Sequence, residues 1–181
     1  MKKRKYFNNK LPSDAEYFGT PDYAIDPIIK YIPKGVKHIW EPTAGQCNIV
    51  NRLKHHGYTL TATDKYPQMK SIVRHDFLLD PLLDKYDMII MNPPFKQMIP
   101  FIEKMYEQDK PFMFIGPAHT INSIKRQVMF KKHGINVIAF DKRVEYVSPD
   151  AHHCPYYSHW FLGNVDEKNN LYFEVVKKLK H

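Results

Sequence analysis

The stretch VKHIWEPTAGQCNIVNRLKHHGYTLTATD, residues 36–64, contains the pattern that decides the fold. It opens and closes with short runs rich in β-branched and aromatic residues, 36–40 and 58–63, which predict two strands. Residues 49–56 between them show the apolar spacing of a helix. A helix that connects two strands in this way indicates a parallel sheet, because parallel neighbours need a crossover connection.

The rest of the chain repeats the same alternation. Further strands are predicted at 88–91, 111–115, 136–140 and 159–162, and further helices at 26–31, 99–108 and 121–132. The tail 171–180 can form a strand, a helix or both, and we favour a closing strand. We therefore predict one α/β domain over residues 1–181, with a Rossmann-like, doubly wound and mostly parallel sheet.

The composition indicates the kind of partner. The 181 residues include 27 Lys and Arg against 19 Asp and Glu, a net charge of +8 that favours nucleic acid, and residues 1–15 form a basic arm. No apolar run approaches the roughly 20 residues of a membrane span, so we expect no membrane partner. Two distant cysteines predict no disulfide framework and fit the cytoplasm.

Ligands of doubly wound sheets bind at the carboxyl ends of the strands, so the residues that follow each predicted strand are candidates for a binding or catalytic site. The turn after the first strand, with Glu41 and Gly45, has small residues that let the backbone approach a bound molecule. Asp64 ends the second strand about 20 residues further on, the spacing of a carboxylate that binds a ribose. Asp76 and Phe77 are candidates to bind the edge and the face of an adenine ring.

The fourth predicted stretch of interest is Asn92-Pro93-Pro94-Phe95, which follows the apolar strand 88–91. The two prolines restrict the backbone, so the Asn92 side chain and the Pro93 carbonyl form a rigid polar corner. An exocyclic amine is a poor nucleophile, and two acceptors that bind its protons make its nitrogen more reactive. Phe95 can stack on the base that carries this amine.

Together these residues resemble the S-adenosylmethionine-dependent amino-methyltransferases with a D/N-P-P-Y/F motif, especially the small phage-type DNA adenine N6-methyltransferases. The resemblance covers most of the chain and extends to late segments that begin at Asp141 and Ser158. One departure is Cys47, where the family usually has a second glycine. The matching site residues are Phe18, Thr20, Pro21, Glu41, Pro42, Ala44, Gly45, Asp64, Asp76, Phe77 and Asn92 to Phe95.

This resemblance implies a class I methyltransferase fold and S-adenosylmethionine as the cofactor, in a bacterial or phage-infected cytosol. It implies that Glu41 and the turn lie by the methionine portion, Asp64 by the ribose and Asp76 by the adenine. It further implies that Asn92, Pro93, Pro94 and Phe95 carry catalysis on adenine in DNA.

The segment 141–158 is long for a connection between strands and mixes basic with aromatic residues. We expect it to contact nucleic acid through Arg143, Tyr146, His153 and Tyr156, although a solvated hairpin extension explains it equally well. The spacing of His152, His153, Cys154 and His159 matches no common zinc signature, so no metal is predicted.

Three alternatives remain open from the sequence. An RNA adenine or guanine amino-methyltransferase uses a similar Asn-Pro-Pro corner, and so does a protein glutamine methyltransferase, which the basic charge makes less attractive. The third alternative is a nucleic-acid-binding module that has lost turnover, which Cys47 in place of glycine suggests.

Overall fold

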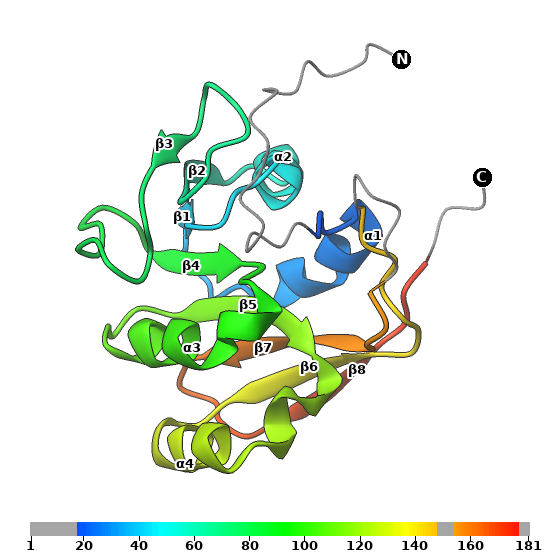
Figure 1. Ribbon diagram of the computed structural model, residues 1–181. Coiled ribbons are helices and arrows are strands. Elements are labelled where there is room, and N and C mark those ends of the chain that lie inside the picture. The colour runs from blue at the N-terminus through cyan, green and yellow to red at the C-terminus, as the bar shows by residue number, and fades with distance from the viewer. Residues whose placement is uncertain (1–17, 148–153, 178–181) are drawn as a thin grey trace.

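The computed structural model describes residues 18–147 and 154–177, and an eight-stranded sheet runs through them (Figure 1). The strand order is β3-β2-β1-β4-β5-β7-β6-β8. The strands are β1 (His38–Glu41), β2 (Thr59–Asp64), β3 (Val73–Arg74), β4 (Met88–Met91), β5 (Phe112–Pro117), β6 (Asn136–Phe140), β7 (Ser158–Gly163) and β8 (Leu171–Glu174). The first five strands in this order, β3, β2, β1, β4 and β5, are all parallel to one another, and β6 pairs in parallel with β8. Strand β7 is antiparallel to both its neighbours, β5 and β6. The predicted mostly parallel sheet is confirmed.

Helices cover both faces of this sheet (Figure 1). Helix α1 (Asp22–Ile25), the 3-10 helix η1 (Asp26–Tyr31) and α2 (Asn48–His55) pack on one face. Helices α3 (Met98–Tyr106) and α4 (Ile124–His133) pack on the other, with the short 3-10 helices η2 (Phe95–Gln97) and η3 (Ala118–Asn122) preceding them. None of the helices in the described residues is long and apolar enough to cross a membrane.

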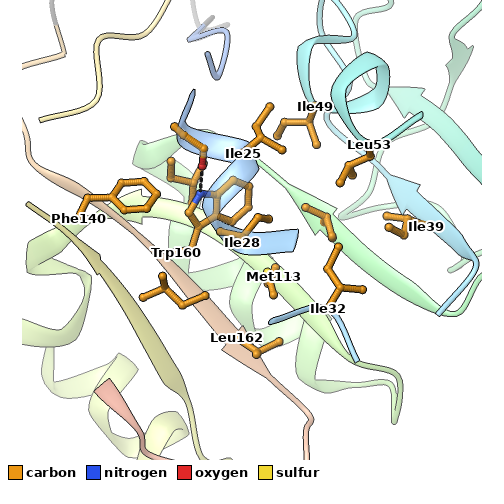
Figure 2. Close-up of a cluster of buried hydrophobic side chains, with 14 of the residues drawn as sticks. Ile25, Ile28, Ile32, Ile39, Ile49, Leu53, Met113, Phe140, Trp160 and Leu162 are labelled. Atoms are coloured by element: carbon orange, nitrogen blue, oxygen red, sulfur yellow. Dashed lines mark hydrogen bonds between the residues drawn. The ribbon is translucent and has the colours of Figure 1, made fainter. Parts of the chain in front are cut away.

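The central strands contribute side chains to two cores. In β4, Met88 and Ile90 join the cluster under α1 and α2, while Ile89 and Met91 join the cluster under α3. All four side chains are fully buried, as expected for a strand covered on both faces. Figure 2 shows the first cluster around Trp160, whose indole N–H donates to the Ala24 carbonyl at 2.8 Å and ties β7 to α1.

Three details of the predicted elements differ from the structure. The single helix predicted over 121–132 is interrupted at Ser123, which is extended and separates η3 from α4. The helix predicted over 26–31 is a 3-10 helix with Pro27 in its first turn. Strand β3 was not predicted, because two exposed residues carry no apolar pattern. The closing strand expected in the tail is present as β8, parallel to β6.

The register of the sheet brings separate parts of the chain to one edge. Glu41 pairs with Ala62 at the carboxyl end of β1, and Trp40 pairs with Ile89 on its other side. Because these three strands are parallel, the turns that follow β1, β2 and β4 all leave from the same edge. Asn92 begins the turn after β4, so the three predicted motifs meet there.

The turn after β1 uses left-handed backbone twice. Gly45 has φ 47° and Cys47, at the N-cap of α2, has φ 62° and ψ 29°. Glycine adopts this conformation without steric cost, whereas a side chain at Cβ strains it. Cys47 therefore has the left-handed backbone that glycine adopts most readily, and its buried side chain packs with Ala44, Val50 and Ile72.

We predict that Cys47→Gly is more stable than Cys47→Ala. Both variants lose the packed thiol, but only glycine relieves the strain, about 1–2 kcal/mol. That gain exceeds the roughly 0.4–1 kcal/mol by which glycine loses more chain entropy on folding. Urea unfolding of the two variants measures the difference. An alanine variant as stable as the glycine variant would show that position 47 is not strained.

Candidate functional site

A cleft opens at the carboxyl edge of the parallel strands. It is lined by the N-terminal segment Phe18 to Thr20, the turn after β1, Asp64 at the end of β2 and the Asn92-Pro93-Pro94 corner after β4. A second hollow lies next to it, and Thr43 and Pro94 line both. The structure thus brings together the motifs that the sequence places up to 76 positions apart, from Phe18 to Pro94.

Asp64 fixes the backbone of the turns that follow β1 and β2. Its Oδ2 accepts a hydrogen bond from the backbone N–H of Gly45 at 2.8 Å, and its Oδ1 accepts one from the N–H of Tyr66 at 2.7 Å. Burial raises the pKa of Asp64 although both hydrogen bonds act to lower it. Each carboxylate oxygen keeps further acceptor capacity, which suits a ligand hydroxyl.

Glu41 is the most deeply buried acid of the cleft, with 2% of its surface exposed. Its Oε2 accepts a hydrogen bond from the N–H of Val50 at 3.0 Å, in the first turn of α2. Burial raises its pKa well above the ordinary value, and the nearby charge of Asp64 raises it further, against the Val50 hydrogen bond. No Lys, Arg or His stands among the described residues that line this cleft, so its titratable side chains are the two acids, Glu41 and Asp64, in a protein of net charge +8.

The second hollow lies beside Asp76 and Phe77. Burial alone would raise the pKa of Asp76, but the ion pair with Lys65 Nζ, 3.1 Å from Oδ2, and the backbone hydrogen bond from Leu78 hold it below its ordinary value. The ring of Phe77 is 2% exposed and stacks on Phe101, with the ring centroids 5.3 Å apart. The hollow therefore has a rigid aromatic wall and a charged rim.

Asn92 is held by the N-terminal segment. Its Nδ2 donates to the Phe18 carbonyl oxygen at 2.6 Å and to Thr20 Oγ1 at 3.2 Å. Thr20 is buried, and Pro21 follows it at the N-cap of α1. The sequence predicts both Asn92 and this segment as site residues, but their direct contact could not be foreseen across more than 70 positions.

Three aromatic rings, from Phe18, Phe95 and Tyr146, contact one another beside the Asn92-Pro93-Pro94 corner. Phe18 and Phe95 stack with their centroids 5.9 Å apart, and Tyr146 lies 5.7 Å from Phe18 and 6.0 Å from Phe95. The hydroxyl of Tyr146 is buried, and burial raises its pKa. Tyr146 thus stands beside the Asn92 corner rather than on the outer surface of the segment 141–158.

Two of the other residues expected to contact nucleic acid lie among the described residues. Arg143 is exposed, and Tyr156 is 45% exposed with its ring packed edge-on against His119, 4.9 Å between centroids. His153 and the basic arm 1–15 lie outside the described residues. Of the residues considered for zinc, Cys154 is buried and His159 Nδ1 accepts a hydrogen bond from the N–H of Phe140. The described part of the chain holds no group of three or more acids, histidines or cysteines suited to a metal ion.

Sequence reasoning did not identify several residues that line the site. These are Thr43, Gln46, Asn48, Ile49, Lys65, Tyr66, Lys96, Gln97 and Phe101. Most of them stand within a few positions of a predicted motif, so proximity to the strand ends was a usable signal. Phe101 was beyond such a signal, because it reaches the hollow from the buried face of α3.

No protein-family model and no curated protein sequence matches the chain. Its fold does match solved structures. One is a protein from Thermoplasma acidophilum, 23% identical, with 78% of this chain and 82% of that chain covered and a TM-score of 0.55.

Another is the methyltransferase subunit of a type I restriction-modification system from Streptococcus thermophilus, 11% identical, with 87% of this chain covered and a TM-score of 0.65. The match covers 47% of that subunit, so this chain corresponds to about half of its length. A third is a proposed RNA methyltransferase from Pyrococcus horikoshii, 16% identical, with 88% and 92% of the two chains covered and a TM-score of 0.61.

These likenesses define the fold. The chain has the class I, Rossmann-like fold of S-adenosylmethionine-dependent methyltransferases, as the resemblance of its motifs implied. Its candidate site occupies the carboxyl edge of the strands, where sheets of this kind bind their ligands.

The charge of Glu41 predicts a pH-dependent gain in stability for Glu41→Gln. Because the folded pKa exceeds the ordinary value of 4.5, the folded state holds the proton more tightly, and stability falls as the pH rises through 4.5 towards the folded pKa. Glutamine does not titrate. The melting temperature of the variant relative to the wild type should therefore rise between pH 4 and pH 7.5. A difference that stays constant over this range would contradict the burial of a destabilised charge.

Proposed function

We propose that this protein transfers the methyl group of S-adenosylmethionine to the N6 amine of adenine in DNA. The observation that carries the proposal is the joining of an acidic cleft to the Asn92-Pro93-Pro94-Phe95 corner at one edge of the sheet. The cleft supplies a place for a cationic donor, and the corner supplies acceptors for an amine. The corner and the cleft are in contact, because Asn92, Pro93 and Pro94 of the corner also line the cleft.

The charge of the cleft selects the kind of cofactor. Phosphate-binding sites present backbone N–H groups, lysine or arginine to the anion. Here the titratable lining side chains are the acids Glu41 and Asp64, with no lysine, arginine or histidine among the described lining residues, and such a site favours a cation over an anion. S-adenosylmethionine carries an ammonium and a sulfonium group and no phosphate, so it fits this cleft better than a dinucleotide does.

Each part of the site then has an assignment. Glu41 and the turn Pro42, Ala44 and Gly45 bind the methionine portion, with the main chain of Phe18, Thr20 and Pro21 on the opposite side. Asp64 binds the ribose hydroxyls. The hollow beside Asp76 and Phe77 takes the adenine ring, for which the rigid wall formed with Phe101 is suitable.

The chemistry at the corner needs no strong general base. The cofactor, when bound, supplies a methyl group activated by its positive sulfur. Asn92 Oδ1 and the Pro93 carbonyl oxygen would accept hydrogen bonds from the two N–H groups of the target amine, which makes its nitrogen more tetrahedral and more nucleophilic as charge develops. Once the methyl group is on the nitrogen, one of these protons leaves to solvent. Phe95 stacks on the base, and Tyr146 lies close enough to bound the same pocket.

Nucleic acid is the substrate class that the surface favours. The net charge of +8 attracts a polyanion, and a base must leave its stack to reach a corner recessed at the sheet edge. Arg143, His153 and Tyr156 are the proposed contacts to the strand. The retained left-handed turn at Cys47 favours a working cofactor site over a module that only binds nucleic acid.

Asp64→Ala tests the cofactor site. Removing a charged acceptor from a ribose hydroxyl should weaken S-adenosylmethionine binding by about 10- to 100-fold, measured by isothermal titration calorimetry. Asp64→Asn keeps the size of the side chain and one acceptor oxygen, which can still accept from Gly45, although its NH2 group then loses the hydrogen bond from Tyr66. The matched control is Asp109→Ala, an exposed acid outside the site, which should bind as the wild type does. Unchanged affinity in Asp64→Ala would remove this assignment.

Asn92→Ala tests catalysis. We expect a loss of methyl transfer of roughly 100-fold or more, because acceptors aimed at a developing charge contribute that much, with cofactor affinity retained. Total DNA and RNA from cells that express the wild type, Asn92→Ala or the exposed-surface control Glu103→Ala are digested, and methylated nucleosides are measured by mass spectrometry. N6-methyldeoxyadenosine supports the proposal. Methylated adenosine or guanosine from RNA alone would replace DNA by RNA as the substrate, and an active Asn92→Ala would remove Asn92 from catalysis.

A further inference from the structure

The contacts of Asn92 determine which way its carboxamide faces. The atom that meets the Phe18 carbonyl oxygen at 2.6 Å must be a donor, because a carbonyl oxygen can only accept. Nitrogen therefore faces Phe18, and the carboxamide oxygen is turned away from it. Hydrogen-bond chemistry therefore determines the orientation of this amide.

Thr20 supplies the second acceptor. Its Oγ1 lies 3.2 Å from Asn92 Nδ2, and the residue is 2% exposed, so this contact is shielded from water. The two donor protons of the amide group thus have two acceptors on the same segment. A flipped amide would place its oxygen against the Phe18 carbonyl and lose the first contact, at the cost of a buried unsatisfied group.

The segment that carries both acceptors is itself anchored. Gly19, between them, forms an antiparallel bridge with Val147, in which each N–H donates to the other's carbonyl at 2.8 Å. This bridge anchors the backbone that carries the Phe18 carbonyl and the Thr20 side chain. It also joins this backbone to the segment that contains Tyr146, whose ring contacts that of Phe18.

We propose that Thr20 is a positioning residue for methyl transfer, which holds the Asn92 amide so that its oxygen points to the acceptor amine. The inference rests on the proposed function for the role of Asn92 and adds a role that differs from cofactor binding. With Thr20 removed, the Phe18 carbonyl still excludes the flipped amide, but the group can rotate about one remaining contact. The loss therefore falls on the rate of transfer and not on the binding of either substrate.

Thr20→Val and Thr20→Ser form the test pair. Valine has the shape of threonine without the acceptor, whereas serine keeps the hydroxyl. Loss of one neutral hydrogen bond should lower kcat about 5- to 10-fold in Thr20→Val. KM for the nucleic acid and Kd for S-adenosylmethionine should stay within about twofold of the wild type, and Thr20→Ser should restore most of kcat.

Two kinetic results would overturn the proposal. An unchanged kcat in Thr20→Val would show that the contact does not position Asn92. A higher Kd for S-adenosylmethionine with unchanged kcat at saturating cofactor would make Thr20 a cofactor-binding residue only.

A spectroscopic readout separates this proposal from the proposed function. The side-chain NH2 resonances of Asn92 in a 15N–1H spectrum are assigned by their loss in Asn92→Ala. They should shift in Thr20→Val and stay near the wild-type position in Thr20→Ser. If the wild type methylates no nucleic acid, the proposed function fails, and the spectrum by itself then tests the contact between Thr20 and Asn92. Unchanged resonances in Thr20→Val then overturn it, and shifted resonances support it.

Discussion

The parallel pairing of β1 with β2 and β4 is the constraint on which the site depends. Since these strands run in the same direction, Glu41, Asp64 and Asn92 all reach one edge of the sheet, although the chain separates the first from the last by about fifty residues. The four apolar residues of β4 face a core on each side and are flanked by Asp87 and Asn92, so a shift of this strand would bury one of these polar residues. Packing in the interior therefore determines where the polar corner lies.

Buried charge is the cost of this arrangement. Glu41 is closed in by α2 and has Asp64 as a negative neighbour, which raises the pKa of Glu41 and weakens the folded state near neutral pH. A cationic ligand offsets the repulsion between the two acids. The cleft thus places two acids, and no lysine, arginine or histidine among its described lining residues, within a protein of net charge +8.

The prediction from sequence succeeded where a pattern is local. β4 and β6 have the expected bounds, since each is a short run of apolar residues bordered by turns. The helix over 121–132 was wrong as one element, because its apolar spacing continues through Ser123 although the backbone is extended there. Asp64 and Asn92, which line the cleft, could be singled out because Asp64 ends one recognisable strand and Asn92 directly follows another. Phe101 was missed because its place on α3 is that of any buried phenylalanine.

The sequence by itself determined the order of strands and helices, the positions of the polar turns and the excess of positive charge, since all of these are read from neighbouring residues or from totals. The tertiary structure alone decided that the Phe18 carbonyl and Thr20 would bind the Asn92 amide, and that Tyr146 would stand beside Phe95. Such contacts join segments more than 50 residues apart. Their geometry depends on how the sheet twists and on the bridge between Gly19 and Val147, neither of which leaves a local pattern in the chain.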